Sequence, residues 1–329
     1  MTARPRVGFL GVGWIGRHRM EAMAATGAID VAAIADPSPE MAAEAAKLAP
    51  GAVAAPDLEA LLDCGLDGVV IASPSALHTE QSIAALTRGA AVFCQKPLGR
   101  TAGEARAVVD AARHADRLLA VDLSYRFTEG MGSVRRLIDE GALGRVYAAD
   151  LVFHNAYGPD KAWFYDPALS GGGCVMDLGV HLIDLALWSL GFPKLTSVTS
   201  KLFAGGEPLA GRLDRVEDYA LATLELETGA AIQLSCSWRL QAGADAIISA
   251  AFYGTEGGAR LANVGGSFYD FTAERFRGTS RETLASPPDA WGGRAAADWA
   301  IRLAAGERFD PEAERLVDVA EALDRIYGR

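Results

Sequence analysis

The sequence predicts an α/β protein of two domains: a parallel sheet covered by helices, then an α/β domain with a large open, mainly antiparallel sheet. The chain has 329 residues, more than the about 100–200 typical of one domain. Short apolar runs alternate with helical segments as far as Asp122, as in consecutive βαβ units. Longer segments of alternating apolar and polar residues follow, the pattern of half-buried strands. We therefore expect domains at 1–122 and 123–329.

Five short runs rich in apolar residues predict the strands of the first domain, because strands buried on both faces are continuously apolar. They are Arg6–Gly11, Asp30–Asp36, Gly68–Ser73, Ala91–Gln95 and Leu118–Asp122. The helical segments between them are Ile15–Thr26, Pro39–Leu48, Leu77–Arg88 and Gly103–Ala115. This alternation indicates a parallel sheet with helices on both faces.

The second domain is predicted to begin with a helix over Met131–Glu140. Five strands with one buried face are expected at Arg145–Asn155, Leu195–Ala204, Val216–Glu227, Ala230–Leu240 and Ala246–Tyr253. The turn 227–229 joins two of them as a hairpin. The segment Gly265–Gly293 has an irregular sequence pattern, so we expect a loop or a sheet edge there. A last helix over 311–327, capped by Asp310 and begun by proline, could pack back on the first domain.

Composition excludes several classes of protein. Lys and Arg number 31 against 42 Asp and Glu, a net charge of −11, so nucleic acid and anionic membranes would repel the chain. No run approaches the about 20 apolar residues of a membrane span, and the N-terminal segment lacks the pattern of a signal peptide. The four cysteines are scattered and fit reduced thiols. We expect a cytoplasmic protein without a nucleic-acid or membrane partner.

A glycine-rich turn follows the first predicted strand and opens a helix. It reads Gly11-Val12-Gly13-Trp14-Ile15-Gly16. The three glycines allow a tight turn, backbone approach to a pyrophosphate and close packing of helix on strand. Asp36 lies 20 residues after Gly16, where a carboxylate accepts hydrogen bonds from ribose hydroxyls. The motif predicts dinucleotide binding, with a ligand-free turn as the alternative. Asp36 would repel a 2′-phosphate, so NAD is expected in preference to NADP.

Two further loops follow predicted parallel strands, at the sheet edge where such folds bind ligands. One contains Ser73, Pro74 and His78, and the other contains Gln95 and Lys96. A lysine directly after a buried strand indicates a cleft, although a surface lysine with a buried stem is the alternative. His78 is more typical of a packed or capping residue than of a ligand contact.

Asp177, His181 and Asp184 lie on a helical segment that is otherwise apolar and follows a run of glycines. Asp177 and His181 are four residues apart and therefore neighbours on one face. Burying such groups is costly without partners. A structural histidine bonded to a carboxylate is one alternative. A metal site is another, but no H-E-x-x-H pattern or set of thiolates supports it.

A polar and aromatic rim is expected where the strand 145–155 ends. It contains His154 and Asn155, followed by Tyr157, Lys161 and Trp163. Hydrogen-bonding groups beside a stacking face suit a polyhydroxylated ligand, and a simple loop at the end of a sheet is an equal alternative.

Together these features resemble the Gfo/Idh/MocA oxidoreductase family, which includes inositol and sugar dehydrogenases, over nearly the whole chain. The resemblance rests on the glycine turn, the Pro74–His78 loop, Gln95-Lys96-Pro97, and the glycine-rich lead into Asp177 and His181. It implies an N-terminal Rossmann domain and a second domain whose open sheet builds a homodimer or homotetramer. It also implies that Lys96 and His181 are catalytic, and that Asp177 touches substrate or orients His181.

The sequence departs from the family pattern at two places. Gln95 stands where the family usually has glutamate, which removes a negative charge beside Lys96. The segment 124–127 matches the family's arginine-rich stretch only loosely, so Arg126 is a weak candidate for substrate binding.

The expected reaction is hydride transfer between a sugar or polyol hydroxyl carbon and a nicotinamide. His181 would accept the hydroxyl proton, Lys96 would stabilise the developing alkoxide, and Asp177 would orient the imidazole. The alternatives are a glycoside hydrolase that uses NAD for a transient oxidation and a sensor that binds a dinucleotide without catalysis. The sensor has no need of a proton-transfer set, which argues against it.

Overall fold

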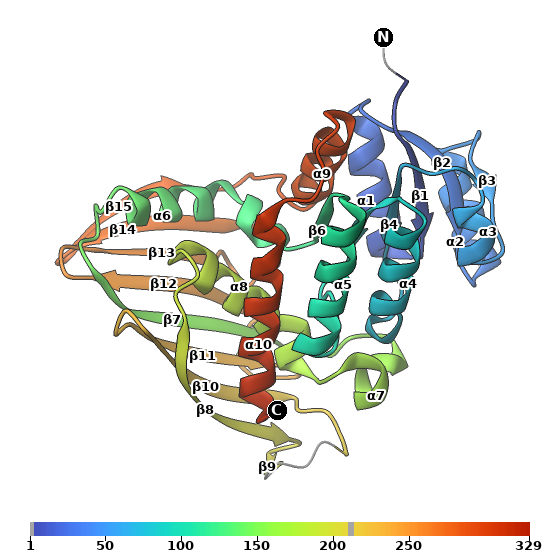
Figure 1. The fold of residues 1–329 in the computed structure, drawn as a ribbon. Coiled ribbons are helices and arrows are strands. Elements are labelled where there is room, and N and C mark those ends of the chain that lie inside the picture. The colour runs from blue at the N-terminus through green and yellow to red at the C-terminus, as the bar shows by residue number, and fades with distance from the viewer. Residues whose placement is uncertain (1–2, 210–213) are drawn as a thin grey trace. The chain divides into compact units, whose positions relative to one another are not determined.

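The chain forms two compact units in a computed structural model that describes residues 3–209 and 214–329. The first unit contains the residues up to Asp122 together with Gly293–Val317, and the second contains Leu123–Gly292 and Asp318–Arg329 (Figure 1). The sequence pattern places 293–317 in the second domain, whereas in the structure this segment packs with the first unit.

The first unit is built on a six-stranded sheet in the order β3-β2-β1-β4-β5-β6, and every neighbouring pair is parallel. Its strands are β1 (Arg6–Leu10), β2 (Asp30–Ala35), β3 (Val53–Ala54), β4 (Gly68–Ile71), β5 (Ala91–Cys94) and β6 (Leu119–Val121). The five expected strands are confirmed. Strand β3 was not predicted, because it has two residues and both are exposed, so it has no apolar run.

Helices cover this sheet. They are α1 (Trp14–Ala25), α2 (Pro39–Leu48), α3 (Leu58–Leu62), α4 (Ser75–Thr87), α5 (Ala102–Ala115), α9 (Arg294–Ala304) and the 3₁₀ turn η4 (Pro311–Glu314). Helix α9 packs beside α1. Its Trp299 is fully buried, with its ring centroid 5.9 Å from that of Phe93. A Cβ on Gly68 would lie 2.7 Å from the Trp299 ring. This packing explains why 293–317 belongs to the first unit.

The second unit contains a nine-stranded sheet in the order β15-β14-β13-β12-β7-β11-β10-β8-β9. The strands are β7 (Val146–Asn155), β8 (Leu195–Ala204), β9 (Glu207–Pro208), β10 (Tyr219–Leu226), β11 (Ala231–Ser237), β12 (Ala246–Gly254), β13 (Gly258–Asn263), β14 (Phe271–Arg277) and β15 (Ser280–Ala285). All pairs are antiparallel except β7 with β11. The expected mainly antiparallel sheet and the β10–β11 hairpin are confirmed.

The prediction of a loop or an edge at 265–293 is confirmed in part, because β15 is an edge strand of the sheet, and it is wrong for β14, which is paired on both sides. Charged residues such as Arg275 and Glu282 interrupt the apolar alternation of these two strands. β14 pairs with β13 on one side and with β15 on the other. No local sequence pattern predicts this pairing.

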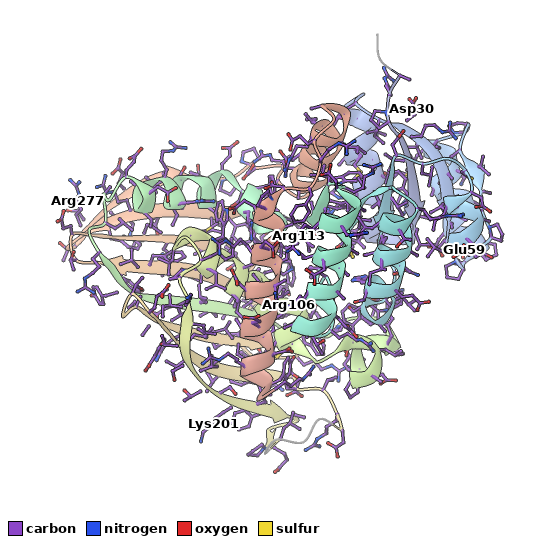
Figure 2. All side chains as sticks on the ribbon, in the orientation of Figure 1. Asp30, Glu59, Arg106, Arg113, Lys201 and Arg277 are labelled. Atoms are coloured by element: carbon purple, nitrogen blue, oxygen red, sulfur yellow. The ribbon has the colours of Figure 1, made fainter. Side chains whose placement is uncertain are left out.

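Helices of the second unit cover one face of its sheet: α6 (Glu129–Asp139) contacts β13 and β14, and α8 (Val180–Ser189) contacts β7 and β12 (Figure 1). The remaining helical elements are η1 (Ser124–Phe127), η2 (Ala162–Tyr165), α7 (Pro167–Ser170), the π-helical turn η3 (Val175–Gly179) and α10 (Arg315–Tyr327). From Asp318 onward α10 groups with the second unit. Figure 2 shows how charged side chains such as Lys201 and Arg277 stand on the exposed positions of this unit.

The stretch Pro167–Ser189 is the one segment of the described chain whose length and hydropathy would suffice to cross a membrane. No membrane-spanning run was expected here from the sequence, because glycines and Asp177 interrupt the apolar residues of this stretch. In the structure 78% of its apolar window is buried, as in a helix at the centre of a protein core.

Candidate functional site

The glycine turn of the first unit is compact where it meets the sheet and open at its middle. Gly11 has φ +82°, and a Cβ there would lie 2.6 Å from the Ala72 carbonyl oxygen. A Cβ on Gly16 would lie 2.1 Å from the Gly11 carbonyl oxygen. A Cβ on Gly13 would meet no atom within 4 Å. The turn thus packs tightly through two glycines and leaves the backbone of the third accessible to a ligand.

Asp36 directly follows β2, and its carboxylate accepts a hydrogen bond from the glycine turn. The Val12 N–H donates to Asp36 Oδ2 at 2.7 Å, and the Ser38 N–H donates to Oδ1 at 2.8 Å. Each carboxylate oxygen has about two acceptor positions, so the side chain can still accept ribose hydroxyls. Beside it, Trp14 is 64% exposed and its ring stacks on that of His18.

His78 joins the two loops that follow β4 and β5. It is 1% exposed, and its ring nitrogens lie 2.7 Å from the Pro97 carbonyl oxygen and 2.8 Å from that of Ser73. Burial lowers the pKa of His78, which the two backbone hydrogen bonds oppose. Both nitrogens are therefore engaged by the protein, and His78 acts on the site by fixing the loop backbones. The Ser73 hydroxyl donates to Gln81.

Gln95 belongs to a buried polar cluster directly before Lys96. Its Nε2 donates to Asp122 Oδ2 at 2.6 Å, and Arg19 Nε donates to the same oxygen at 2.5 Å. Asp122 is 1% exposed and Gln95 is 8% exposed. The Gln95 amide and the Arg19 guanidinium thus both donate to this buried carboxylate. Gln95 could be recognised in the sequence as a departure, but no pattern indicated Asp122 as its partner. Lys96 itself is half-buried.

In the second unit, Asp177 lies in the π-helical turn η3 and His181 in the first turn of α8. Both are half-buried on a segment whose other residues from 171 to 187 are buried. The Trp238 Nε1–H donates to Asp177 Oδ2 at 3.0 Å. The His181 ring centroid lies 5.0 Å from that of Tyr125, edge to face. An indole and an aromatic ring thus fix the two polar side chains in place.

His181 lines a cavity between α8 and the sheet. Its other lining residues are Tyr125, Phe153, Leu182, Leu185, Ile248, Ser249, Ala250 and Leu261. Most of them are apolar, so the imidazole is the one titratable nitrogen base among these lining groups. Burial raises the pKa of Tyr125, which keeps its hydroxyl neutral.

Arg126 is engaged by Asp184 on α8. Its Nε donates to Asp184 Oδ2 at 2.8 Å and its second nitrogen bonds the other carboxylate oxygen. Asp184 is 1% exposed; burial raises its pKa, and Arg126 opposes this shift. Such a paired, bidentate contact is typical of arginine and carboxylate. Arg126 thus stabilises the helix of His181, a role that the sequence did not assign to either residue.

Of the predicted rim, His154 makes contacts with residues of β11 and β10. Phe153 lines the cavity, so His154, its neighbour along β7, points to the opposite face of the sheet. There its Nδ1 lies 2.9 Å from the Ser237 hydroxyl and its ring stacks on Tyr219. Substrate binding by His154 stays a prediction.

Asn155 and Trp163 of the rim have local contacts. Asn155 accepts a hydrogen bond from the Tyr157 N–H at 2.7 Å, which closes a turn at the end of β7. Trp163 stacks on Phe164, with ring centroids 3.8 Å apart.

Within residues 3–209 and 214–329, no group of three or more histidine, cysteine or acidic side chains is arranged to hold a metal ion. Two of the four thiols, both buried, are unsuited to nucleophilic chemistry. Burial raises the pKa of Cys94 to about 12, and burial likewise raises the pKa of Cys174.

Comparison with known proteins gives matches over most of the chain. Residues 5–123 match the family model "Oxidoreductase family, NAD-binding Rossmann fold", and residues 131–260 match "GFO/IDH/MocA C-terminal domain". Inositol 2-dehydrogenase of Streptomyces avermitilis is 29% identical over 98% of this chain and 97% of its own length. D-glucoside 3-dehydrogenase of Escherichia coli is 32% identical over 59% of this chain, and the match spans 58% of that enzyme.

Solved structures share the fold across the whole chain. Levoglucosan dehydrogenase with NADH and levoglucosan superposes with a TM-score of 0.84 and 23% identity, covering 99% of this chain and 97% of the other. GenD2 from gentamicin A biosynthesis, bound to NAD, gives a TM-score of 0.82 and 25% identity, with 100% and 96% covered. A 3-ketoreductase from Actinomadura kijaniata, also similar in fold, holds NADP.

The cluster around Asp122 generates a prediction for Gln95→Glu. The introduced carboxyl would face the Asp122 carboxylate at hydrogen-bond distance, and two buried like charges repel. At pH 5 the new carboxyl can keep a proton and donate it to Asp122, as the amide does now. We expect unfolding midpoints in urea close to those of the unsubstituted chain at pH 5 and clearly lower at pH 8.

Glu59→Gln, at an exposed acidic position in α3, serves as the control for an amide–carboxyl exchange and should change the midpoint little at either pH. Equal midpoints for Gln95→Glu and the unsubstituted chain at pH 8 would contradict the assigned role of the Gln95 amide.

Proposed function

Because the chain belongs to the Gfo/Idh/MocA oxidoreductase family, we propose that it transfers a hydride between a nicotinamide and the hydroxyl carbon of a sugar or polyol. Both family models support the coarser statement that it is an NAD(P)-binding oxidoreductase. Inositol and D-glucoside dehydrogenases among its relatives favour a sugar or polyol as substrate. The observation that carries the proposal is the pair Asp177 and His181, two half-buried polar side chains on an otherwise buried apolar segment, where polar groups are costly to place.

The first unit would hold the dinucleotide through the open backbone at Gly13 and the Asp36 carboxylate. A bound nicotinamide would supply the carbon that accepts or returns the hydride. In the oxidation direction, the substrate carbon loses a hydride while its hydroxyl loses a proton. His181 takes that proton, because an imidazole titrates near neutral pH.

Lys96 is proposed to donate a hydrogen bond to the substrate oxygen and to stabilise the negative charge that develops there. Asp177, held by Trp238, keeps the imidazole in its reactive orientation or accepts a neighbouring substrate hydroxyl. In the reverse direction His181 returns the proton to the carbonyl oxygen.

A panel of aldoses, inositols and sugar acids with NAD tests this function through the absorbance of NADH. We expect at least one substrate to be oxidised. His181→Asn and Lys96→Ala should each lower kcat by about 10²–10⁴-fold, the usual contribution of a general acid or base, while NADH binding measured by fluorescence remains. His114→Asn, at an exposed position of α5, is the matched control and should keep full turnover.

Full activity of His181→Asn would contradict the proton assignment. A sugar product formed without net NADH would favour the glycoside hydrolase, and dinucleotide binding with no turnover across the panel would favour the sensor.

We propose NAD as the preferred cofactor, because the Asp36 carboxylate stands where a 2′-phosphate would add a second negative charge. Asp36→Asn removes the charge and keeps an acceptor for the Val12 N–H. The ratio of kcat/KM for NADP to that for NAD should rise by about tenfold or more, equivalent to about 1.4 kcal/mol. An unsubstituted chain that prefers NADP would contradict the proposal.

Self-association as a homodimer or homotetramer is proposed through the face of the nine-stranded sheet opposite to α6 and α8. Leu221 and Ile247 alternate with buried neighbours along β10 and β12 and are 43% and 38% exposed. Apolar side chains on an open sheet face favour burial against another surface. Light scattering at micromolar concentration should give at least twice the chain mass of 34.6 kDa, and the mass of a single chain would contradict the proposal.

A further inference from the structure

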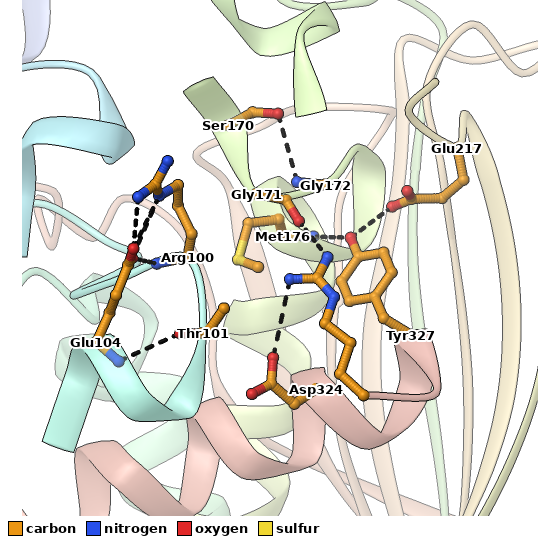
Figure 3. A network of polar contacts seen from close by, with 11 residues as sticks. Arg100, Thr101, Glu104, Ser170, Gly171, Gly172, Met176, Glu217, Asp324 and Tyr327 are labelled. Atoms are coloured by element: carbon orange, nitrogen blue, oxygen red, sulfur yellow. Dashed lines mark hydrogen bonds and ion pairs between the residues drawn. The ribbon is translucent and has the colours of Figure 1, made fainter. Parts of the chain in front are cut away.

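The turn that leads into η3 is held by side chains from two segments far away in the sequence (Figure 3). The Gly173 N–H donates to both carboxylate oxygens of Glu217, each at 3.0 Å, and the Val175 N–H donates to Oε1 at 2.9 Å. The Tyr327 hydroxyl donates to the same Oε1 at 2.8 Å and accepts from the Met176 N–H at 3.2 Å. Three of the four backbone N–H groups from 173 to 176 are thus bonded to two side chains.

These contacts provide the cap that η3 otherwise lacks. Cys174 stands at the cap position and makes no side-chain cap hydrogen bond. The first N–H groups of a helix have no partner within it and carry partial positive charge. Glu217, 1% exposed, places a carboxylate against them. Burial raises the pKa of Glu217, and the backbone and Tyr327 donors oppose that shift.

Glycines at 172 and 173 make this close approach possible. A Cβ on Gly172 would lie 2.0 Å from the Tyr327 hydroxyl, and a Cβ on Gly173 would lie 1.9 Å from the Glu217 carbonyl oxygen. The same carbonyl accepts the Cys174 N–H at 3.0 Å. Any larger residue would push the turn away from Glu217 and Tyr327.

The helix start is fixed at a second point by the same pair of strands. Glu217 lies just before β10 and Trp238 just after β11, and these strands pair with Tyr219 opposite Ser237. Glu217 binds the backbone of the turn, whereas Trp238 binds the Asp177 side chain. A π-helical turn is rare and often marks a functional site. Here the turn carries Asp177, which is bonded to Trp238, and leads directly into α8 with His181.

From these contacts we propose that Glu217 and Tyr327 are positioning residues that set the orientation of the Asp177 and His181 side chains. The proposal rests on the proposed function only in naming those two side chains as the reacting ones. Neither Glu217 nor Tyr327 touches the substrate in this assignment. They act through the backbone at 173–176.

Two substitutions test the proposal with complementary changes. Tyr327→Phe removes one hydroxyl and keeps the ring, so the unit should still fold. Glu217→Gln removes the charge and turns an amide N–H toward the Gly173 N–H, a contact between two donors. The matched controls are Tyr253→Phe, which removes a hydroxyl bonded to Asp150, and Glu274→Gln, at a buried carboxylate bonded to Arg260.

The first measurements need no substrate. Hydrogen–deuterium exchange of the peptide covering 171–178 should be about five- to tenfold faster in Tyr327→Phe and faster still in Glu217→Gln, because one or more hydrogen bonds of about 1 kcal/mol are lost. The NMR signal of the His181 ring, identified among the five histidines by its loss in His181→Asn, should shift in both variants and stay unchanged in both controls.

Kinetics with a substrate from the panel should show kcat lower by about tenfold in Tyr327→Phe, with KM for NAD unchanged. An unchanged His181 signal in both variants would overturn the proposal, as would unchanged exchange or an unchanged kcat. Failure to find any substrate would count against the proposed function alone, since exchange and the His181 signal are measured without turnover.

Discussion

The cost of burying a carboxylate governs both candidate sites. Asp122, Asp184 and Glu217 are each 1% exposed, and a buried carboxylate without donors would cost several kcal/mol. Each therefore holds a neighbour of the reacting groups in one arrangement: Gln95 before Lys96, Arg126 beside the helix of His181, and the turn before Asp177. The side chains proposed to react are half-buried, whereas these three carboxylates are almost fully buried. The polar groups proposed to react and the buried groups that hold their surroundings in one arrangement are thus different residues.

The parallel sheet of the first unit could be predicted from the sequence because five of its six strands each carry their own apolar signal. An apolar run such as that of β4 is buried on both faces and needs no partner to be recognised. The segment 293–317 could not be placed, because its assignment depends on Trp299 reaching Phe93 and Gly68, some 200 residues earlier in the chain. Strands β14 and β15 were missed because their pairing, rather than their apolar content, defines them.

In the candidate site too, contacts between residues distant in the sequence could not be predicted. The glycine turn, Lys96 and the Asp177–His181 pair follow from short motifs, but their partners Asp122, Trp238 and Tyr327 are distant in sequence, and no spacing connects them. His154 is different, because a signal was present. Leu151 and Phe153 lie at alternate positions of β7 and share one face of the sheet. Because successive side chains of a strand point to opposite faces, the sequence already indicates that His154 lies on the other face. The polar rim was inferred from composition, without using the parity of the strand, which separates His154 from Phe153.

The two glycine-rich turns look alike in the sequence and differ in what approaches them. At Gly13 a Cβ would enter open space, whereas at Gly172 and Gly173 it would collide with atoms of this chain. The first turn therefore has room for something that the protein does not contain, and the second is already filled by Glu217 and Tyr327. A glycine run beside a proposed site is thus no evidence of ligand binding by itself. The atom that a Cβ would meet decides whether the missing side chain makes room for a ligand or for the protein's own interior.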